Sequence, residues 1–344
     1  MKVRLIAEPK NIYTLDDVFN KVKNAQALYL AGKFEEAYPI VVDVTKTFDF
    51  LASIGLTGDN LNKPQYKAVY MLAGDICGEL GKFDEALAHY KKHQFFNLQI
   101  NHDFRDHETV TLFQFRNTRA YTLNNLRNNQ ITLVDPRMQN DIVDSPIFSW
   151  LETLCGHNAR HKNHLAAFKA SFNYLRATSF CTDSSSSKAI ENTLMWAHYA
   201  NCHKGICVEY ELGKKDFSSN YTSGSTLMRL MRIKYIDPNL DSNVLDFTNP
   251  ETKMNMRTAL ATKSIDWGYE NEVRMIAYTP TEEQKYVQCT LDTPNPIKAI
   301  YFGVKCPAQR KNAVRKIFED RPEVSFFQME INPQNIHRLI YKPC

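Results

Sequence analysis

The fold of this chain is decided by the stretch LMWAHYANCHKGICVEYEL, residues 194–212. Its first part is rich in helix formers, and the serines at residues 184–187 offer hydroxyl groups suited to capping a helix. Gly205 supplies the backbone freedom that a helix exit needs, and Ile206 to Tyr210 has the residue types of a β-strand. The stretch therefore predicts a helix that turns sharply into a strand, with two aromatic rings and two histidines at the corner.

The chain is long enough for two domains. It has 344 residues, of which 43% are hydrophobic, and its net charge of +4 neither requires nor excludes nucleic acid. No apolar run is long enough to span a membrane, and the first residues lack the apolar core of a signal peptide. The eight cysteines are scattered, without CxxC pairs. We therefore expect a cytoplasmic protein with reduced cysteines and no membrane contact.

The first hundred residues contain an internal repeat. AQALYLAGKFEEAY at residues 25–38 is echoed by GELGKFDEALAHY at residues 78–90. A turn glycine followed by an aromatic residue and an alanine is typical of the helix pairs in tetratricopeptide repeats, which this region resembles. An insertion near residues 49–64 would explain the long spacing. The repeat predicts a groove for a protein or peptide partner; the alternative is a helical domain that serves only for packing.

Strand and helix patterns alternate beyond the repeat. Thr109 to Arg116 and Gln130 to Val134 are rich in β-branched and aromatic residues, and a short helical span at residues 121–128 separates them. Further strands are predicted at residues 229–235, 273–278 and 297–303, and further helices at residues 254–262 and 310–318. We predict an α+β protein: a helical domain at residues 1–105, then a mixed, mostly antiparallel sheet with flanking helices at residues 106–344.

Several motifs of the second domain occur in an order shared with a known family. FQFRNTRAYTLNNLRNNQITLV at residues 113–134 comes first, followed by a strand ending in Cys181, the helix-to-strand corner, and WGYENEVR at residues 267–274. A last strand at residues 297–303 completes the set. The chain thereby resembles, over residues 110–340, a bacterial family called domain of unknown function 2971. The loop QNDIVD at residues 139–144 departs from the family's Phe-Asn-Asp-Pro-Phe-Asp pattern.

Two carboxylates offer a candidate for catalysis. Glu270 and Glu272 lie at a loop-to-strand junction, where residues two apart point to the same face. With Arg116 on an early strand, they resemble the mono-ADP-ribosyltransferases, whose Glu-or-Gln-x-Glu turn works with a strand arginine. On this hypothesis Glu272 stabilises the positive charge that develops on the ribose of NAD, and Glu270 orients or deprotonates the acceptor. Arg116 binds the pyrophosphate or the ribose.

The aromatic corner would complete the NAD site. Tyr199 or Trp196 would stack on the nicotinamide, and His198, His203 and Lys204 would lie beside the cofactor, the last two flanking an exposed turn suited to a phosphate. The alternative is packing alone, in which the two rings bury apolar area, His198 satisfies a backbone carbonyl and Lys204 is a solvated surface charge.

Other interpretations remain open from the residues. Glu270 and Glu272 could instead pair with Arg274 or Lys263 on a solvated edge. The whole domain could be a non-catalytic sensor of nucleotides or peptides, or a nucleic-acid-processing enzyme. If it is an ADP-ribosyltransferase-like enzyme, the family resemblance suggests a role in bacterial defence or toxicity. The motifs of dinucleotide dehydrogenases, P-loop NTPases and α/β-hydrolases do not occur.

Histidines and cysteines cluster twice, yet neither cluster predicts a metal site. One cluster consists of His198, Cys202, His203 and Cys207, and the other of Cys155, His157, His161 and His164. In the first, Cys207 lies in a predicted strand, where it is suited to a core position. In the second, basic and amide residues are interleaved as on a solvated helix face. We therefore expect no metal.

Overall fold

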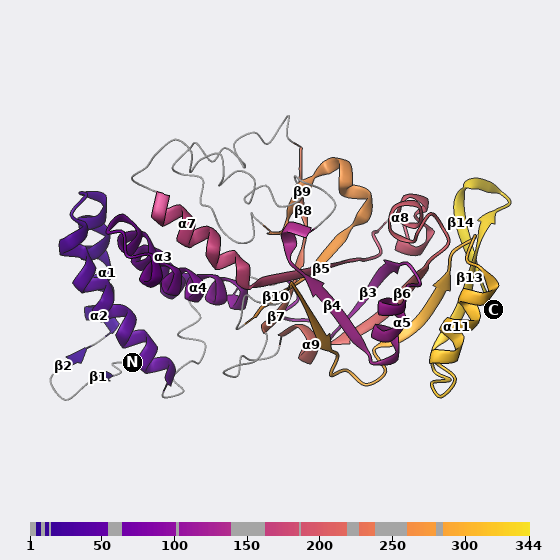
Figure 1. Cartoon of the computed structure of the whole chain (residues 1–344), viewed down its shortest axis with the longest axis horizontal. Helices are drawn as coiled ribbons and strands as arrows, with labels where there is room; N and C mark the ends of the chain where they lie inside the picture. Colours follow the sequence, from indigo (N-terminus) through magenta and orange to yellow (C-terminus); the bar gives the residue numbers. More distant parts are fainter. Residues whose placement is uncertain are drawn as a thin grey trace. The chain divides into compact units, whose positions relative to one another are not determined.

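The chain folds into two compact units in this computed structural model (Figure 1). The first consists of residues 1–101 and 146–174, and the second of residues 102–145 and 175–344. The structure describes residues 5–7, 11–13, 15–53, 64–100, 103–138, 162–185, 187–218, 227–237, 260–279 and 285–344. The predicted α+β class is confirmed, because N-terminal helices precede a mixed, mostly antiparallel sheet with flanking helices.

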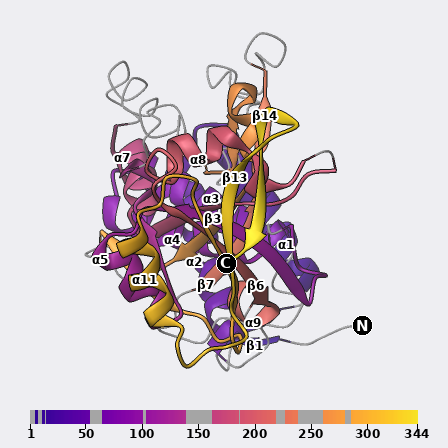
Figure 2. The ribbon, with the colours of Figure 1, turned by 90° about the vertical axis from the view of Figure 1, so that its right-hand side faces the viewer.

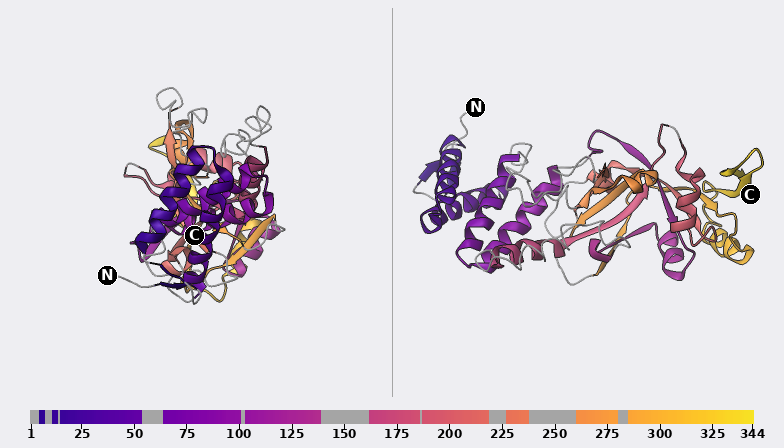
Figure 3. Two further views of the ribbon diagram at one scale, coloured as in Figure 1. Left: turned by 90° about the vertical axis from the view of Figure 1, so that its left-hand side faces the viewer. Right: turned by 90° about the horizontal axis from the view of Figure 1, so that it is seen from above.

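The first unit contains two helix pairs of the same build (Figure 3). Its elements are β1 (Leu5–Ala7), β2 (Asn11–Tyr13), α1 (Leu15–Leu30), α2 (Phe34–Ser53), α3 (Pro64–Glu79), α4 (Phe83–Ile100), α7 (Lys162–Ser171) and η3 (Phe172–Tyr174). Gly32 and Gly81 end the first helix of each pair with φ of 72° and 71°, left-handed values that glycine adopts readily. Ala37 and Ala86, five residues after these glycines, are completely buried. The predicted helical repeat of the sequence is thus two equivalent turns; its assignment to the tetratricopeptide class stays a prediction.

Helix α7 packs against α3 and α4 and so lies in the first unit. The predicted limits of 1–105 and 106–344 had placed this segment in the second domain. Several other predictions concern residues outside the described ranges: the loop at residues 139–144, Cys155, His157 and His161, and most of the insertion predicted near residues 49–64. A helix was predicted at residues 254–262, of which the structure describes residues 260–262. Its last residue, Thr262, belongs to strand β9 (Thr262–Ser264) instead.

The second unit is built on one large sheet with the strand order β11-β4-β5-β3-β6-β12-β13-β14, and β10 joins β5 to β7. Its principal strands are β3 (Thr109–Arg116), β4 (Gln130–Val134), β5 (Leu175–Cys181), β6 (Ile206–Gly213), β7 (Leu227–Arg232), β10 (Glu272–Tyr278), β11 (Tyr286–Thr290), β12 (Ile297–Phe302), β13 (Ser325–Asn332) and β14 (Asn335–Pro343). Strand β8 (Lys234–Ile236) pairs with β9 in a separate parallel ribbon. Within the sheet only β12 and β13 run parallel, among the pairings that the described residues show.

Both faces of the sheet carry an apolar core, because successive side chains of a strand point to opposite sides. Leu112 and Val208 pack on one face with Val314 of helix α11 (Ala308–Ile317) and with helix α5 (Ala120–Arg127). Their neighbours Phe113 and Cys207 pack on the other face, under helix α8 (Thr193–Tyr199). The predicted strand-helix-strand order around α5 is therefore confirmed, and so is the helix-to-strand corner between α8 and β6.

Two sequence predictions about strands were wrong. The strand at residues 297–303 was expected to be the last, but α11, β13 and β14 follow it. A single strand was expected at residues 229–235, whereas β7 and β8 are separated at Ile233, where the chain leaves the large sheet to pair with β9.

Candidate functional site

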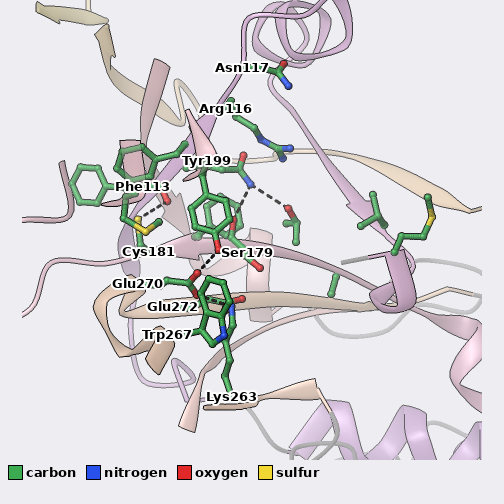
Figure 4. Close-up of a pocket in the computed structure, with 18 of the residues that line it drawn as sticks. Phe113, Arg116, Asn117, Ser179, Cys181, Tyr199, Lys263, Trp267, Glu270 and Glu272 are labelled. Atoms are coloured by element: carbon green, nitrogen blue, oxygen red, sulfur yellow. Dashed lines mark hydrogen bonds and ion pairs between the residues drawn. The ribbon is translucent and has the colours of Figure 1, made fainter. Parts of the chain in front are cut away.

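A pocket of about 900 Å³ opens where two neighbouring strands of the second unit diverge (Figure 4). Strand β3 pairs with β6 along its whole length but with β5 only at Phe113 and Cys181. Beyond that point Gln114 bridges the gap, donating from Nε2 to Thr178 Oγ1 at 3.2 Å and to the Ser179 carbonyl at 3.1 Å. The strand ends thus form two walls of the pocket.

Four of the predicted site residues line this pocket together: Arg116, Tyr199, Glu270 and Glu272. They come from β3, from α8, and from the turn into β10, whose first residue is Glu272, so segments far apart in the sequence meet here. The remaining lining residues are Phe113, Gln114, Phe115, Asn117, Tyr121, Val134, Met138, Ala177, Thr178, Ser179, Phe180, Cys181, Met195, Lys263 and Trp267.

The turn that carries the two carboxylates is fastened to the end of β5. Glu270 ends the short helix η6 (Ile265–Glu270), and Asn271 then adopts a left-handed conformation with φ of 43°. Its side-chain amide donates to the carbonyls of Thr182, at 2.9 Å, and Asp183, at 3.0 Å. Asparagine tolerates this conformation better than most residues, so the turn presents Glu270 and Glu272 to the pocket in a defined orientation.

The carboxylates belong to a buried ionic network. Lys263 Nζ lies 2.7 Å from Glu270 Oε2 and 3.5 Å from Glu272 Oε2, and Arg274 Nη2 lies 2.8 Å from Glu272 Oε1. The Tyr199 hydroxyl donates to Glu270 Oε1 (Figure 4). The side chains of the four charged residues are at most 6% exposed. Lys263 and Arg274 are therefore partners of the acids, as one interpretation had it, but in the interior and not on a solvated edge.

The two acids differ in their tendency to ionise. Burial raises the pKa of Glu270, the nearby negative charge of Glu272 adds to the effect, and the hydrogen bonds from Lys263 and Tyr199 offset it only in part. Burial also opposes ionisation of Glu272, but the charges of Arg274 and Lys263 outweigh it and lower the pKa. The pocket thus holds one carboxylate that stays ionised and one that takes up a proton more readily.

Arg116 lines the same pocket as these acids. In Figure 4 its guanidinium lies on the other side of Tyr199 from Glu270. The side chain is half-buried, and within the described ranges it makes no hydrogen bond or ion pair. A guanidinium in a pocket can bind an anionic ligand group through two parallel hydrogen bonds.

Helix α8 is positioned by Asn192, not by the serines at residues 184–187 that the sequence suggested as caps. The Asn192 side-chain oxygen accepts from the backbone N–H of Leu194, at 3.0 Å, and its amide donates to the Tyr269 carbonyl, at 2.8 Å. One residue thereby caps the helix and ties it to η6. Ser184 instead closes its own loop, with its hydroxyl accepting from the Ser187 N–H.

Trp196 lies in the core and does not line the pocket, which contradicts its predicted stacking role. It is completely buried, donates from Nε1 to the Ile190 carbonyl at 2.7 Å, and packs edge-on against Phe115. His198, two residues further on, lies on the exposed side of α8, where its Nδ1 is 2.9 Å from the Tyr269 hydroxyl. It neither lines the pocket nor satisfies a backbone carbonyl through this contact.

His203 and Lys204 also lie outside the main pocket. Three successive residues, Asn201 to His203, have positive φ values of 50°, 54° and 65°, which turn the chain tightly after α8. Burial and the charge of Lys305 lower the pKa of His203, so the ring is less readily charged than a free histidine. Lys204 contributes to a second, smaller hollow of about 200 Å³.

Sequence reasoning missed the polar wall of β5 and the importance of Lys263. Thr178 and Ser179 lie in a strand whose pattern gave no sign that it borders a cavity. Lys263 appeared only as a surface partner of the acids. One signal could have found it: Trp267, four residues later, has its ring 4.6 Å from Lys263 Nζ, and a lysine close to an aromatic and an E-x-E turn suits a buried ion pair.

Metal-binding side chains do not gather in the part of the chain that the structure describes, where no three His, Cys, Asp or Glu residues form a group. Of the first predicted cluster, Cys207 is buried in the core and Cys202 is exposed. The prediction that the protein needs no metal stays a prediction.

Fold and site define a two-unit α+β protein with an acid-lined pocket in its second unit. The model of a family described as "Protein of unknown function (DUF2971)" matches residues 195–275, from α8 to the first half of β10. The match thus includes Tyr199, Glu270 and Glu272. No curated protein and no solved structure matches the chain. None of the helices in the described ranges is long and apolar enough to cross a bilayer.

Proposed function

We propose that the second unit is an ADP-ribosyltransferase-like enzyme that uses NAD. The observation that carries the proposal is that one pocket is lined by two chemically different carboxylates, Glu270 and Glu272, and by the guanidinium of Arg116, which has no ion pair among the described residues. Pairs of carboxylates whose environments separate their pKa values commonly divide the roles of charge stabilisation and proton transfer.

The pocket suits NAD in size and in lining. Ligand sites range from about 300 to 1,000 Å³, and this one measures about 900 Å³. Arg116 offers two parallel N–H groups to the pyrophosphate. Tyr199 and Trp267 present rings along the wall near the acids, so either can pack against the nicotinamide. Trp267 takes the place that the sequence analysis gave to Trp196.

The proposed chemistry breaks the bond between the ribose C1′ and the nicotinamide nitrogen. Both bonding electrons leave with the nitrogen, which becomes neutral, while positive charge develops on the sugar. Glu272, held ionised by Arg274 and Lys263, stabilises that charge. The lone pair of an acceptor oxygen or nitrogen then forms the new bond to C1′, and Glu270 takes the acceptor's proton.

The test is release of nicotinamide from NAD by the full chain, followed by chromatography. We expect Glu272→Gln to reduce the rate about 100- to 1,000-fold, because the developing charge loses its anionic partner. The matched control is Glu108→Gln, whose side chain is 81% exposed and pairs only with Lys214 among the described residues. The control should turn over NAD like the wild type.

A second variant guards against a folding defect, because removing the charge of Glu272 leaves Arg274 with a weakened buried partner. Arg116→Ala removes a side chain outside the ionic network, so thermal unfolding should change little while NAD binding weakens. Arg338→Ala, at an exposed position of β14, is its control. If nicotinamide is released by Glu272→Gln and Arg116→Ala as fast as by the wild type, the proposal is wrong.

A further inference from the structure

The second hollow of about 200 Å³ adjoins the main pocket and is markedly basic. Asn117 lines both, so the two cavities share a rim. Its other lining residues are Thr118, Arg119, Asn201, Lys204, Pro307 and Arg310. The three charged side chains among them are all cationic and exposed.

The segments that build this hollow contain no acidic residue at all. Residues 109–134, 192–208 and 293–318 include no aspartate or glutamate, although the whole chain has 38. Although the net charge of the whole chain is only +4, the acidic residues are unevenly distributed along it. Arg119, Lys204 and Arg310 make no ion pair with any residue that the structure describes, so their potentials add over this part of the surface and attract polyanions.

The basic surface extends beyond the hollow along two packed helices. Figure 2 shows α5 and α11 side by side. Arg310 Nη1 donates to the Thr118 carbonyl at 3.1 Å, and Arg321 Nη1 donates to Asn129 Oδ1 at 2.8 Å, so the helices are joined at both ends of α5. Arg127 is exposed at the end of α5, and the exposed acids Glu319 and Asp320, which follow α11, mark the end of the basic surface. A single bound phosphate would use only the hollow, whereas a chain of phosphates would use the whole length.

An exposed aromatic ring lies at the rim between the two cavities. Tyr121 lines the main pocket, is 46% exposed, and accepts a hydrogen bond from Asn117 Nδ2 at 3.1 Å. A ring held at the edge of a cationic surface is the arrangement that proteins use to stack an unpaired base while lysines and arginines bind its backbone.

We propose that a single-stranded nucleic acid binds along α5 and α11, with a phosphate in the hollow and a base on Tyr121. Resting on the proposed function, the strand is the acceptor whose nucleotide enters the main pocket beside Glu270. The phosphodiester groups would neutralise the charges of Arg119, Lys204 and Arg310. Stacking of a base would also use the exposed ring of Tyr121, which an acidic peptide would not.

The test measures fluorescence anisotropy of a labelled single-stranded oligodeoxynucleotide with the full chain and without NAD. Arg119→Gln combined with Lys204→Gln should weaken binding at least tenfold and reduce the slope of log affinity against log salt by about 1.4, since each contact to a single strand contributes about 0.7. The control combines Lys298→Gln with Lys342→Gln, which change the charge equally at surface pairs with Glu211 and Glu330. It should bind like the wild type.

Tyr121→Leu separates stacking from charge, because it should weaken binding while leaving the salt slope unchanged. The proposal is overturned if the wild type does not bind the oligonucleotide, if both charge variants lose affinity equally, or if poly-glutamate competes as well as the oligonucleotide. If the wild type binds the oligonucleotide but releases no nicotinamide from NAD, the proposed enzyme is contradicted and the nucleic-acid surface is not.

Discussion

Two glutamates separated by a single residue meet opposite electrostatic surroundings. Glu272 lies between Lys263 and Arg274, whose charges lower its pKa. Glu270 has no arginine partner, and both burial and the charge of Glu272 raise its pKa. Since the groups interact, protonation of one strengthens the ionisation of the other, and the pair titrates as a unit. The assignment of base and charge stabiliser follows from these partners and not from the order of the residues.

We predict that Tyr199 influences how the rate of nicotinamide release falls at low pH, the acid limb of its pH profile. Glu270 must be deprotonated to accept a proton, so transfer should slow as pH falls through its raised pKa. Tyr199→Phe removes a hydrogen bond that favours the carboxylate, which raises this pKa further and moves the acid limb to higher pH. Because hydrogen bonds to charged groups are worth about 1.5–3 kcal/mol, some stability is lost as well.

The matched control for this prediction is Tyr301→Phe. Tyr301 donates its hydroxyl to Glu209 Oε2 at 2.7 Å, outside the pocket, so the same atom is removed from a similar pair. When the rate of nicotinamide release is measured between pH 4 and 8, the acid limb should shift to higher pH only in Tyr199→Phe. An identical shift in both variants would show that Glu270 does not govern the acid limb.

At the residue level the sequence predicted which side chains carry charge, but not which of them turn inward. Trp196 and Tyr199 are three residues apart on one short helix, and both suited a stacking role. Only the packing of α8 against Phe115 shows that the tryptophan is core and the tyrosine lines the cavity. For Lys263 the sequence gave the right carboxylate partners but the wrong surroundings, because it placed the pair on a solvated edge and the structure buries it.

Among the elements, the turn at Asn271 determines how the acids are presented. Asn271→Ala should lose both the amide hydrogen bonds to Thr182 and Asp183, which follow β5, and the tolerance of a positive φ, whereas Asn271→Gly loses only the hydrogen bonds. We expect stability to fall by about 1–3 kcal/mol in the alanine variant and by less in the glycine variant, with nicotinamide release reduced in both.

Asn295→Ala is the control for this turn, because Asn295 also has a positive φ, of 49°, and does not line either pocket. Chemical denaturation should show a comparable loss of stability there, with the specific activity of the folded protein unchanged. Equal activity in the Asn271 and Asn295 variants would mean that the turn has no part in placing the carboxylates.

Elements with strong local patterns were predicted correctly, and those defined by distant pairing were not. The composition of β3, α5, β4 and β6 predicts whether each is a strand or a helix, because runs of β-branched and aromatic residues alternate with good helix formers. The pocket itself arises because β3 and β5 pair at a single position, Phe113 with Cys181. No local signal encodes such a divergence, since it depends on which strand each edge meets across the sheet.

For the molecule as a whole, the two compact units predict separable responses to mutation. A methyl group on Gly74 in α3 would lie 2.4 Å from the Tyr90 ring of α4, so Gly74→Ala forces these helices apart. Overpacking of this kind costs about 1–3 kcal/mol. Hydrogen exchange should become faster in α3 and α4, while β3, β5 and β10 keep their protection.

Gly32→Ala provides the comparison, because no atom of the residues that the structure describes lies within 4 Å of the added methyl group and only the positive φ, of 72°, is strained. Its effect should be smaller and confined to the turn between α1 and α2. Faster exchange of β10 in Gly74→Ala would show that the two units unfold together.

The turn at Gly205 limits how the pocket can be altered. A methyl group on Gly205 would lie 2.2 Å from the Arg116 carbonyl oxygen, and one on Gly303 would lie 2.3 Å from that of His203. Three backbone segments are therefore in van der Waals contact with only hydrogen atoms between them. A redesign of the ligand preference can therefore change the exposed side chain of Lys204, but it cannot add even one methyl group at Gly205 without moving the backbone of β3.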